Sequence, residues 1–381
     1  MSKCPLSLVR PRPLFPLPAD VLISALLRAL HQLDVDEAVI CANGKTSVLR
    51  KYFLDDPAEH VRLGFYDDEL PRGTAGCLAD VADFVRGGTF LVLEAGLYLD
   101  GDLGRLIEEH RRSGSALTLA SVPARHWMSG DGDGAVDEPM SPLGVYVAEP
   151  AVLEHIPTKG YCDIKEQLIP RLCEKSLDVS VTRYCGRHRR VAEARSYVRL
   201  VYEILSGVFG RTAFAPLREV APGVWASENA QVDPSATLIG PVVVAANAVV
   251  GAEAVIAGPA LIGERVLVGD RAFVNSSIVW PNASIGFGAR VEHSVVADSF
   301  RVAAHAELSR CVAVDHELKL GDVHGLRLGG YGLRSLGRSV GGAQGQLSVI
   351  PALRKLWRSV AAVRRGNGIV RNSQGSSLRV L

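Results

Sequence analysis

The 381-residue sequence lacks a long apolar run and any closely spaced pair of cysteines. No stretch approaches the ~20 apolar residues needed to cross a bilayer, and the first 18 residues contain prolines rather than the apolar segment of a signal peptide. The seven cysteines include no C-x-x-C pair, which argues against a zinc site and favours reduced thiols. We therefore expect a cytoplasmic protein with no metal site.

Acidic residues are absent after Asp322, although nine Arg and one Lys follow it. These ten leave 32 basic against 41 acidic residues in 1–322, so the body carries a charge of −9 and the tail +10. Such a split predicts a separate partner for the tail. The tail has one Trp, one Tyr and no recognisable nucleic-acid-binding module, so we expect no specific nucleic-acid partner.

An apolar residue recurs every six positions in the middle of the chain. The series runs from Val232 to Trp280, resumes one residue early at Ile285, and slips again to run from Val302 to Val314. A period of six is neither the 3.6 of a helix nor the 2 of a strand. It is typical of a solenoid in which each hexad forms one short strand and one corner, and roughly fifteen hexads would form about five coils.

The first 200 residues alternate short apolar strands with helical patterns. Strands are expected at 37–42, 89–96, 116–123 and 143–150, and helices at 20–33, 75–86, 102–112 and 194–208. This alternation predicts a mainly parallel α/β sheet covered on both faces. The expected domains are an α/β domain at 1–208, a linker at 209–222, the solenoid at 223–316, a Gly-rich linker at 317–347 and a basic amphipathic tail at 348–381.

Several segments resemble, in order, those of sugar-1-phosphate nucleotidyltransferases. RPRPLFPLP (10–18) resembles their Pro-Lys-Pro segment, DELPRGTAG (68–76) their Gly-Thr-Ala-Gly turn, FLVLEAG (90–96) the strand that ends in Asn-Gly-Asp, and DIKEQLIPRL (163–172) a later acidic segment. The hexads resemble the repeats of left-handed parallel β-helices, a combination most similar to mannose-1-phosphate guanylyltransferases. The resemblance implies a Rossmann-like (GT-A-like) nucleotidyltransferase domain followed by a left-handed parallel β-helix.

Enzymes of that family move a nucleoside monophosphate from an NTP onto a sugar 1-phosphate and release pyrophosphate. The resemblance places the Pro-Lys-Pro lysine at Arg12, and it places the two metal-binding Asp positions at Gly96 and Arg190. The family's first strand and its Gly-rich phosphate loop would precede Pro5, so we expect a domain lacking its first strand. Mg²⁺ is expected only if the chain is active, because both expected carboxylate positions have other residues.

Gly73, Thr74, Ala75 and Gly76 retain the motif that in the family lies against the base and ribose, and they are the candidate nucleotide-binding residues. The same four residues are equally typical of a tight turn that caps a helix. Asp100 and Asp102 are candidates for substitute metal ligands, although capping the helix that follows is the favoured interpretation.

Three interpretations of function remain open. A homologue that does not catalyse, or catalyses poorly, would sense a nucleotide or nucleotide sugar and form homo- or hetero-oligomers with an active paralogue in polysaccharide biosynthesis. An active enzyme with a mis-assigned start is the first alternative. A hexapeptide-repeat acyltransferase is the second, with His293, His305 or His316 as base.

The segment 350–365 predicts an amphipathic helix that carries only basic charges. Its apolar residues recur at spacings of three and four, with Trp357 among them, and Arg and Lys fill the remaining positions. This pattern suits an anionic membrane surface, which would place the protein at the inner face of the membrane. Packing of the helix on the acidic body is the equally weighted alternative.

Overall fold

The computed structural model describes residues 4–42, 46–55, 61–67, 71–123, 140–210 and 214–314, together with the backbone of 379–380. The chain divides into two compact units. One combines the N-terminal segment to Ile23 with residues from Arg189 onwards, including the solenoid, and the other contains Ser24–His188 and the C-terminal residues. The predicted Gly-rich linker and basic tail lie outside the described residues, apart from 379–380.

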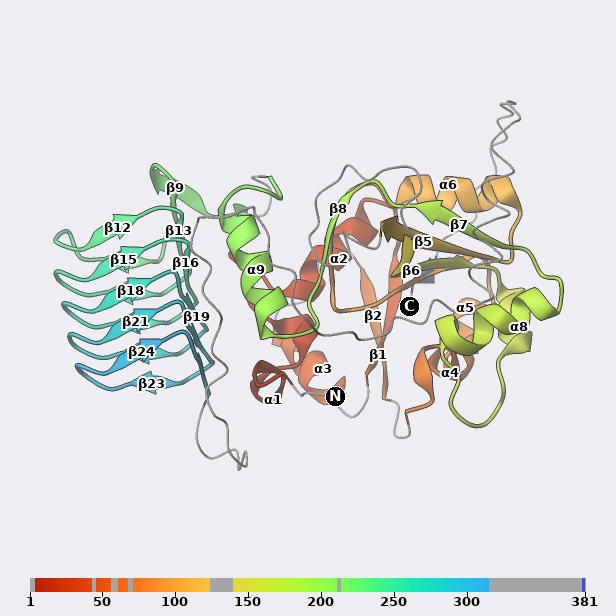
Figure 1. Cartoon of the computed structure of the whole chain (residues 1–381), viewed down its shortest axis with the longest axis horizontal. Helices are drawn as coiled ribbons and strands as arrows, with labels where there is room; N and C mark the ends of the chain where they lie inside the picture. Colours follow the sequence, from red (N-terminus) through yellow and green to blue (C-terminus); the bar gives the residue numbers. More distant parts are fainter. Residues whose placement is uncertain are drawn as a thin grey trace, which may run out of the picture. The chain divides into compact units, whose positions relative to one another are not determined.

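A seven-stranded mixed sheet forms the centre of the α/β unit (Figure 1). Only β6 runs against its neighbours; the other pairs are parallel. The strand order is β2 (Arg62–Asp67), β1 (Glu37–Ala42), β26 (Arg379–Val380), β3 (Phe90–Leu93), β6 (Met140–Ala148), β5 (Leu117–Pro123) and β7 (Val179–Arg183). No strand earlier than β1 belongs to this sheet in the described part of the chain; β26 lies in the central position instead.

Both faces of the sheet are covered, as the sequence predicts. All seven residues of β5 are buried. Leu117 and Leu119 belong to an apolar core shared with α4, α5, η2, η3 and α8, whereas Thr118 points the other way and contacts His110 of α6. The helices are α2 (Leu22–His31), α3 (Thr46–Asp55), α4 (Gly73–Asp80), α5 (Ala82–Val85), α6 (Gly104–Ser113), η2 (Pro150–His155), the π-helix η3 (Ile164–Leu168) and α8 (Ile169–Glu174). The strands β4 (Leu97–Asp100) and β8 (Arg187–Arg190) form a separate two-stranded sheet.

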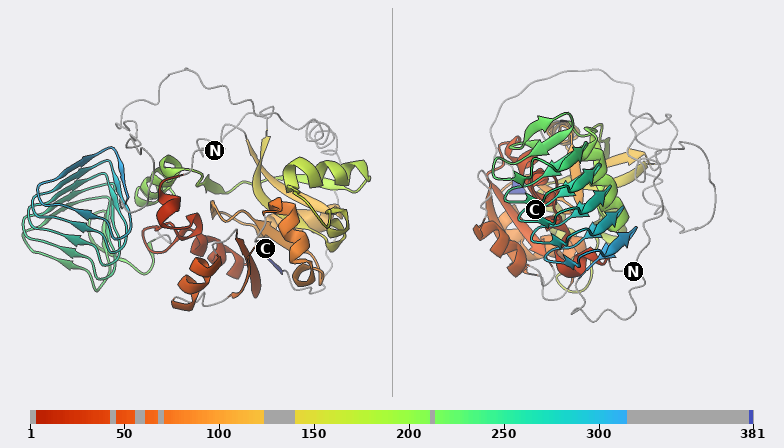
Figure 2. Two further views of the ribbon diagram at one scale, coloured as in Figure 1. Left: turned by 90° about the horizontal axis from the view of Figure 1, so that it is seen from below. Right: turned by 90° about the vertical axis from the view of Figure 1, so that its left-hand side faces the viewer.

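The hexads form a parallel β-solenoid of about five turns, whose stacked coils are visible in Figure 2. Its three sheets are β9–β10–β13–β16–β19–β22–β25, β11–β14–β17–β20–β23 and β12–β15–β18–β21–β24. The antiparallel strand β9 (Arg218–Ala221) lies within the predicted linker 209–222 and pairs with the first coil. The parallel strands are β10 (Val224–Ala226), β11 (Gln231–Val232), β12 (Thr237–Ile239), β13 (Val242–Val244), β14 (Val249–Val250), β15 (Val255–Ala257), β16 (Ala260–Ile262), β17 (Leu267–Val268), β18 (Phe273–Asn275), β19 (Ile278–Val279), β20 (Ser284–Ile285), β21 (Arg290–Glu292), β22 (Val295–Val296), β23 (Arg301–Val302), β24 (Glu307–Ser309) and β25 (Val312–Ala313).

The predicted phase of the repeat is wrong by one residue at Trp280. Val279, and not Trp280, pairs with Ile262 and belongs to the solenoid core. The pairing register shows one residue fewer here: residues 258–260 separate Ala257 from Leu261, whereas only Ser276 and Ser277 separate their partners Asn275 and Ile278. The slip therefore precedes Trp280, and this residue leaves the core series.

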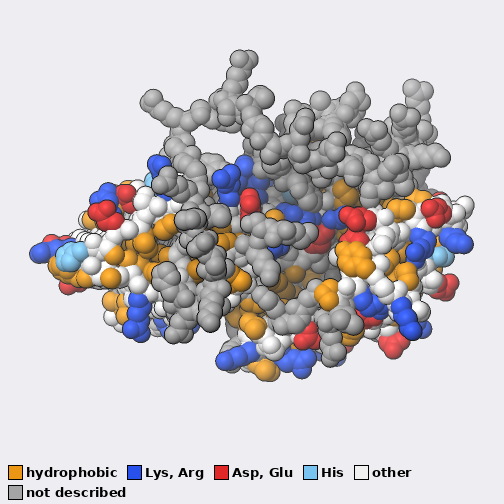
Figure 3. Space-filling view, turned by 60° about the horizontal axis from the view of Figure 1, so that its bottom comes forward, with side chains coloured by type: hydrophobic (Ala, Val, Ile, Leu, Met, Phe, Trp, Pro, Cys, Tyr) orange, Lys and Arg blue, Asp and Glu red, His pale blue; other side chains and the backbone are white. Residues whose placement is uncertain are grey.

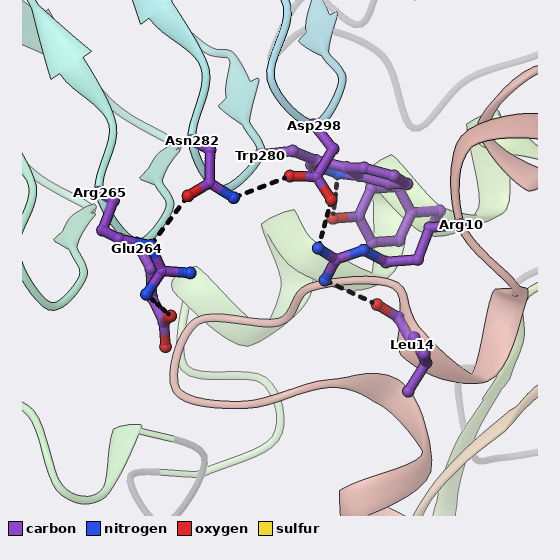
Figure 4. A network of polar contacts seen from close by, with 8 residues as sticks. Arg10, Leu14, Glu264, Arg265, Trp280, Asn282 and Asp298 are labelled. Carbon is purple, nitrogen blue, oxygen red and sulfur yellow. Dashed lines mark hydrogen bonds and ion pairs between the residues drawn. The ribbon is translucent and has the colours of Figure 1, made fainter. Parts of the chain in front are cut away.

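Trp280 instead joins the solenoid to α9 (Ala194–Leu205) and to the N-terminal segment, which contains α1 (Leu6–Val9) and η1 (Arg12–Leu14). Its indole Nε1 donates to the Tyr197 hydroxyl over 2.9 Å, and that hydroxyl donates to the carbonyl of Pro16 over 2.6 Å. The Phe15 ring packs against both aromatic rings at centroid distances of 5.2 Å. Beside them Arg10 forms an ion pair with Asp298 (Figure 4). Arg10 and Phe15 of the N-terminal segment therefore contact the solenoid directly, although the predicted domain limits themselves stay predictions.

Candidate nucleotide site

The candidate site lies at the carboxyl edge of the parallel strands in the α/β unit. The Gly73–Gly76 turn follows β2 along the chain and begins α4. Glu94, Ala95 and Gly96 follow β3 directly and form the turn into β4. Because ligands of open α/β sheets bind outside the carboxyl ends of the strands, these two segments occupy the expected edge.

Gly73 and its neighbours are fitted closely against Cys162. Gly73 has a φ of +80°, and a Cβ at this position would lie 2.5 Å from the Cys162 carbonyl oxygen. That same oxygen accepts hydrogen bonds from the backbone N–H groups of Ala75 and Gly76, over 3.0 and 3.1 Å. These two amides at the start of α4 are therefore already hydrogen-bonded within the chain, and only glycine fits at 73.

The Thr74 side chain connects the turn to Asp163. Its Oγ1 donates to Asp163 Oδ2 over 2.9 Å and accepts from the Ile164 N–H over 2.9 Å. The other oxygen of Asp163 accepts from the N–H groups of Lys165 and Glu166, so Asp163 caps η3. Thr74 does not cap its own helix, contrary to the capping interpretation of the motif; it supports the start of η3.

Glu94 is paired with a cation from the same segment. Lys165 Nζ lies 2.7 Å from Glu94 Oε1, and both side chains are about three-quarters buried, with exposures of 27% and 24%. Gly96 lies half-buried two residues further along the turn. The segment from Cys162 to Lys165 thus holds both the Gly73–Gly76 turn and the turn after β3.

This arrangement does not fit the Mg²⁺ ion that the family implies. Mg²⁺ prefers carboxylate oxygens in near-octahedral geometry, yet Gly96 supplies no side-chain ligand and the nearby Glu94 is neutralised by Lys165. Asp102 is used elsewhere, because its Oδ1 accepts from the Gly104 N–H over 2.7 Å at the start of α6. Within the described residues no group of three or more His, Cys, Asp or Glu could hold a metal ion.

Two further candidate positions belong to the other unit. Arg12 lies exposed in η1, and Arg190 ends β8. The neighbouring Arg189 is nearly buried and forms two hydrogen bonds with Glu203, of 2.9 and 2.6 Å. Gly73–Gly76 and Gly96 therefore lie at one edge of the α/β unit, whereas Arg12 and Arg190 belong to the solenoid unit.

The two residues before Asp163, Tyr161 and Cys162, differ in their exposure to solvent. Burial raises the pKa of the Cys162 thiol, so this thiol is protonated at neutral pH and is a poor nucleophile. Tyr161 has 59% of its surface exposed, and its ring edge is 3.0 Å from where a Gly73 Cβ would lie. The turn therefore has an accessible aromatic ring directly beside it.

A hollow of about 570 Å³ lies further along α4, lined by Arg72, Asp80, Arg86, Glu154 and Thr158 among others. Arg72 is an ion-pair partner of Asp80 and donates to the Pro157 carbonyl over 2.7 Å. Thr74, Glu94 and Lys165 do not line this hollow. The residues of the Gly73–Gly76 turn do not line it either, and Arg72, one of the two Arg residues in its lining, is already engaged.

The described coils of the solenoid offer no support for the acyltransferase alternative. His293 and His305 occupy corners, with φ values of +47° and +59°, and the His305 ring packs against Phe287 at 5.2 Å. The described coils follow one another without an inserted loop between residues 224 and 314. His316 lies outside the described residues.

Comparison with known proteins matches both halves of the chain. A model of the nucleotidyl transferase family matches residues 4–129, and one of the GMPPB C-terminal domain matches residues 220–322. The mannose-1-phosphate guanylyltransferase of Mycobacterium tuberculosis is 26% identical over 64% of this chain and 72% of its own. Both halves of the chain are thus similar to members of the sugar-1-phosphate nucleotidyltransferase family.

Members of that family differ in the nucleotide named for them. A UTP–glucose-1-phosphate uridylyltransferase of Synechocystis is 24% identical over 77% of this chain and 83% of its own. A probable mannose-1-phosphate guanylyltransferase of Oryza sativa is 23% identical over 77% and 86%. At these identities the similarity to mannose-1-phosphate guanylyltransferases does not assign a base or a sugar to this chain.

The residues that support the turn carry no sequence signal that links them to it. Asp163 lies 89 residues from Thr74, and Lys165 lies 71 residues from Glu94, and no periodicity links them. Asp163 did carry one local signal, since an acidic residue before an apolar helical segment is typical of a helix cap.

Proposed function

We propose that this chain is a nucleotidyltransferase homologue that does not catalyse nucleotidyl transfer, or catalyses it poorly. It binds a nucleotide or nucleotide sugar and serves as a sensing or assembly subunit in nucleotide-sugar and polysaccharide biosynthesis. The observation that carries the proposal is the Glu94–Lys165 ion pair beside Gly96, at the turn where the family's metal-binding carboxylate is expected.

Phosphoryl transfer depends on neutralising the charge of the phosphates. Enzymes achieve this with metal ions held by carboxylates and with well-placed cations. At this turn Lys165 neutralises a carboxylate of the chain itself and forms a 2.7 Å contact with it. A cation engaged in this way contributes less to binding a triphosphate, and the paired Glu94 is a weak candidate for binding a metal.

Retention of ligand binding is supported by Tyr161 beside Gly73. A purine or a pyrimidine base can stack on an exposed aromatic ring. The Tyr161 ring is held close to a backbone that cannot shift easily, because Gly73 is in contact with Cys162. A base stacked on Tyr161 would place its ribose near the exposed Thr74.

Release of pyrophosphate tests the catalytic part of the proposal. The full chain is incubated with Mg²⁺, each of five NTPs and mannose or glucose 1-phosphate, and we expect release at the rate of a no-enzyme control. Turnover near one per second would show instead an active guanylyltransferase-type enzyme, the alternative that the similarity of both halves to such enzymes favours.

Calorimetric titration tests the binding part independently. GTP, UTP and their sugar nucleotides are titrated into the full chain and into Tyr161→Ala. One stacked base is worth about 1–3 kcal/mol by alanine substitution, so we expect binding to weaken by roughly tenfold. The matched control is Tyr52→Ala, on α3, which should bind normally. Absence of binding by the unmodified chain would refute the sensing role.

A further inference from the structure

The central strand of the α/β sheet comes from the far end of the sequence. β26 lies between β1 and β3 and is parallel to both. Val380 is in register with Ala38 on one side and Leu91 on the other, and Arg379 is in register with Phe90. In Figure 1 the C label marks this strand among β1, β2 and β6. A space one strand wide therefore separates β1 from β3, and we call it the central slot.

The described pairing of β26 in the central slot is short. Within the described residues it pairs through two residues with β3 and through one with β1, whereas β1 and β2 are paired over six residues. Short ladders open more readily than long ones. Release would leave the facing edges of β1 and β3 unpaired in the middle of the sheet, which is unfavourable for both.

The residues on either side of the central slot are apolar and buried. Ala38, Phe90 and Leu91, the residues in register with β26, are each at most 4% exposed. An incoming segment must therefore be extended, supply N–H and C=O groups on both sides, and be free of proline where it pairs. The sequence Leu378-Arg379-Val380-Leu381 has three apolar residues and no proline, and it meets these requirements.

We propose that the central slot is a strand-binding site whose ligand is the C-terminal segment containing Arg379 and Val380. The segment binds by strand addition, with main-chain hydrogen bonds giving affinity, and a separate peptide of the same sequence can make those bonds in trans. The site does not depend on the nucleotide-binding role of the neighbouring turn.

Peptide binding tests the proposal. A fluorescein-labelled peptide of residues 374–381 is titrated into the full chain and into a chain ending at residue 377, and anisotropy is measured. We expect the shortened chain to bind at least tenfold more tightly, because the full chain's own segment competes. A peptide with Val380→Pro, which loses an N–H and has a fixed φ, should not bind. Equal binding of the first peptide to both chains, or binding to neither, overturns the proposal.

A second experiment keeps the test decisive if the shortened chain does not fold. A protease site inserted after residue 345 is cleaved in the folded full chain, and the fragments are separated by size exclusion. The released C-terminal fragment should remain bound to the body and should be displaced by excess 374–381 peptide. The matched control is an excess of the 374–381 peptide with Val380→Pro, which should displace nothing. Retention of the fragment against both peptides would show that another segment holds it, and separation before any peptide is added would show that the slot does not hold it; either result refutes the proposal.

Discussion

Both its backbone conformation and its neighbours restrict position 73 of the candidate site to glycine. Its backbone is left-handed, and an added Cβ would meet the Cys162 carbonyl at 2.5 Å. We expect Gly73→Ala to destabilise the protein by about 2–4 kcal/mol, since the strain of a positive φ adds to overpacking. Urea unfolding measures this loss.

Gly114 provides a matched control for Gly73→Ala. It ends α6 with a φ of +64°, but nothing lies within 4 Å of its added Cβ. Gly114→Ala should therefore cost only the conformational penalty, about 1 kcal/mol. Equal losses for the two variants would mean that contact with Cys162 does not constrain the turn.

At the scale of single residues, the sequence predicted positions better than partners. The Gly-Thr-Ala-Gly motif located the turn after β2, and the resemblance to the family predicts that Gly96 stands at the position of a metal-binding Asp. The ion pair of Glu94 with Lys165 was not, because it depends on how η3 approaches the end of β3. Contacts between segments far apart in sequence are set by packing, which no local pattern records.

At the scale of elements, the Trp280–Tyr197 hydrogen bond joins α9 to the solenoid. Both side chains are fully buried. We expect Trp280→Phe and Tyr197→Phe each to destabilise the protein, and the double variant to lose less than the sum by about 1 kcal/mol, the net worth of a buried hydrogen bond. A double-mutant cycle by urea unfolding measures the difference. Strict additivity would contradict the bond.

The same element gives a pH dependence. Burial raises the pKa of Tyr197 well above the ordinary tyrosine value of 10.0. The folded state therefore favours the neutral hydroxyl, so its contribution is complete below pH 10 and is lost as the pH rises above 10. We expect the free energy of unfolding to fall more steeply between pH 9.5 and 10.5 in the unmodified protein than in Tyr197→Phe. The exposed Tyr161→Phe should leave the slope nearly unchanged.

Elements with a strong period were predictable, and those defined by pairing were not. The helix at α9 and the strand at β1 begin at the predicted residues. The solenoid followed from its hexads, but the coils shorten from 18 to 17 residues at the Ser276–Ser277 corner. That deletion moved Trp280 out of the core, and an apolar pattern cannot distinguish a core residue from one that packs outward on a helix. Strand β26 has two residues and no pattern of its own.

At the scale of the whole molecule, the last coil of the solenoid favours assembly. Strands β23, β24 and β25 each pair on one side only within the described residues, and such edges favour pairing with another chain. Figure 3 shows acidic and basic side chains interspersed among the described residues of the face that it draws. We expect light scattering of the full chain to give a mass above that of a monomer, alone or with an active paralogue.

Two variants separate edge pairing from contact through a face. Ser309→Lys places a charge at an exposed position of β24, the last strand of its sheet, and should reduce the mass measured by light scattering. Leu267→Lys changes a residue that is 54% exposed in the middle of the stack and should leave it unchanged. A monomer at all concentrations, with and without the paralogue, would contradict the assembly role.

The basic segment 350–365 remains a proposed contact with an anionic membrane surface. No helix in the described part of the chain, which excludes this segment, is long and apolar enough to cross a membrane. Each Lys or Arg near an anionic bilayer adds about 1 kcal/mol. We expect co-sedimentation with anionic vesicles to fall when Arg354, Lys355, Arg358, Arg364 and Arg365 are changed to Ser, and to weaken with salt. Equal sedimentation of the two chains would leave the segment without this role.

The position of β26 also sets the order in which the molecule can be completed during synthesis. Val380 pairs with Ala38 across 342 residues of sequence, so β1 and β3 leave the ribosome long before the strand that lies between them. Until residues 379–380 emerge, the nascent α/β unit has two open edges at its centre, which makes it a substrate for chaperones and prone to wrong pairing. The solenoid, by contrast, pairs each coil with the one before it and can form as it is made. The domain translated first is therefore the one that finishes folding last.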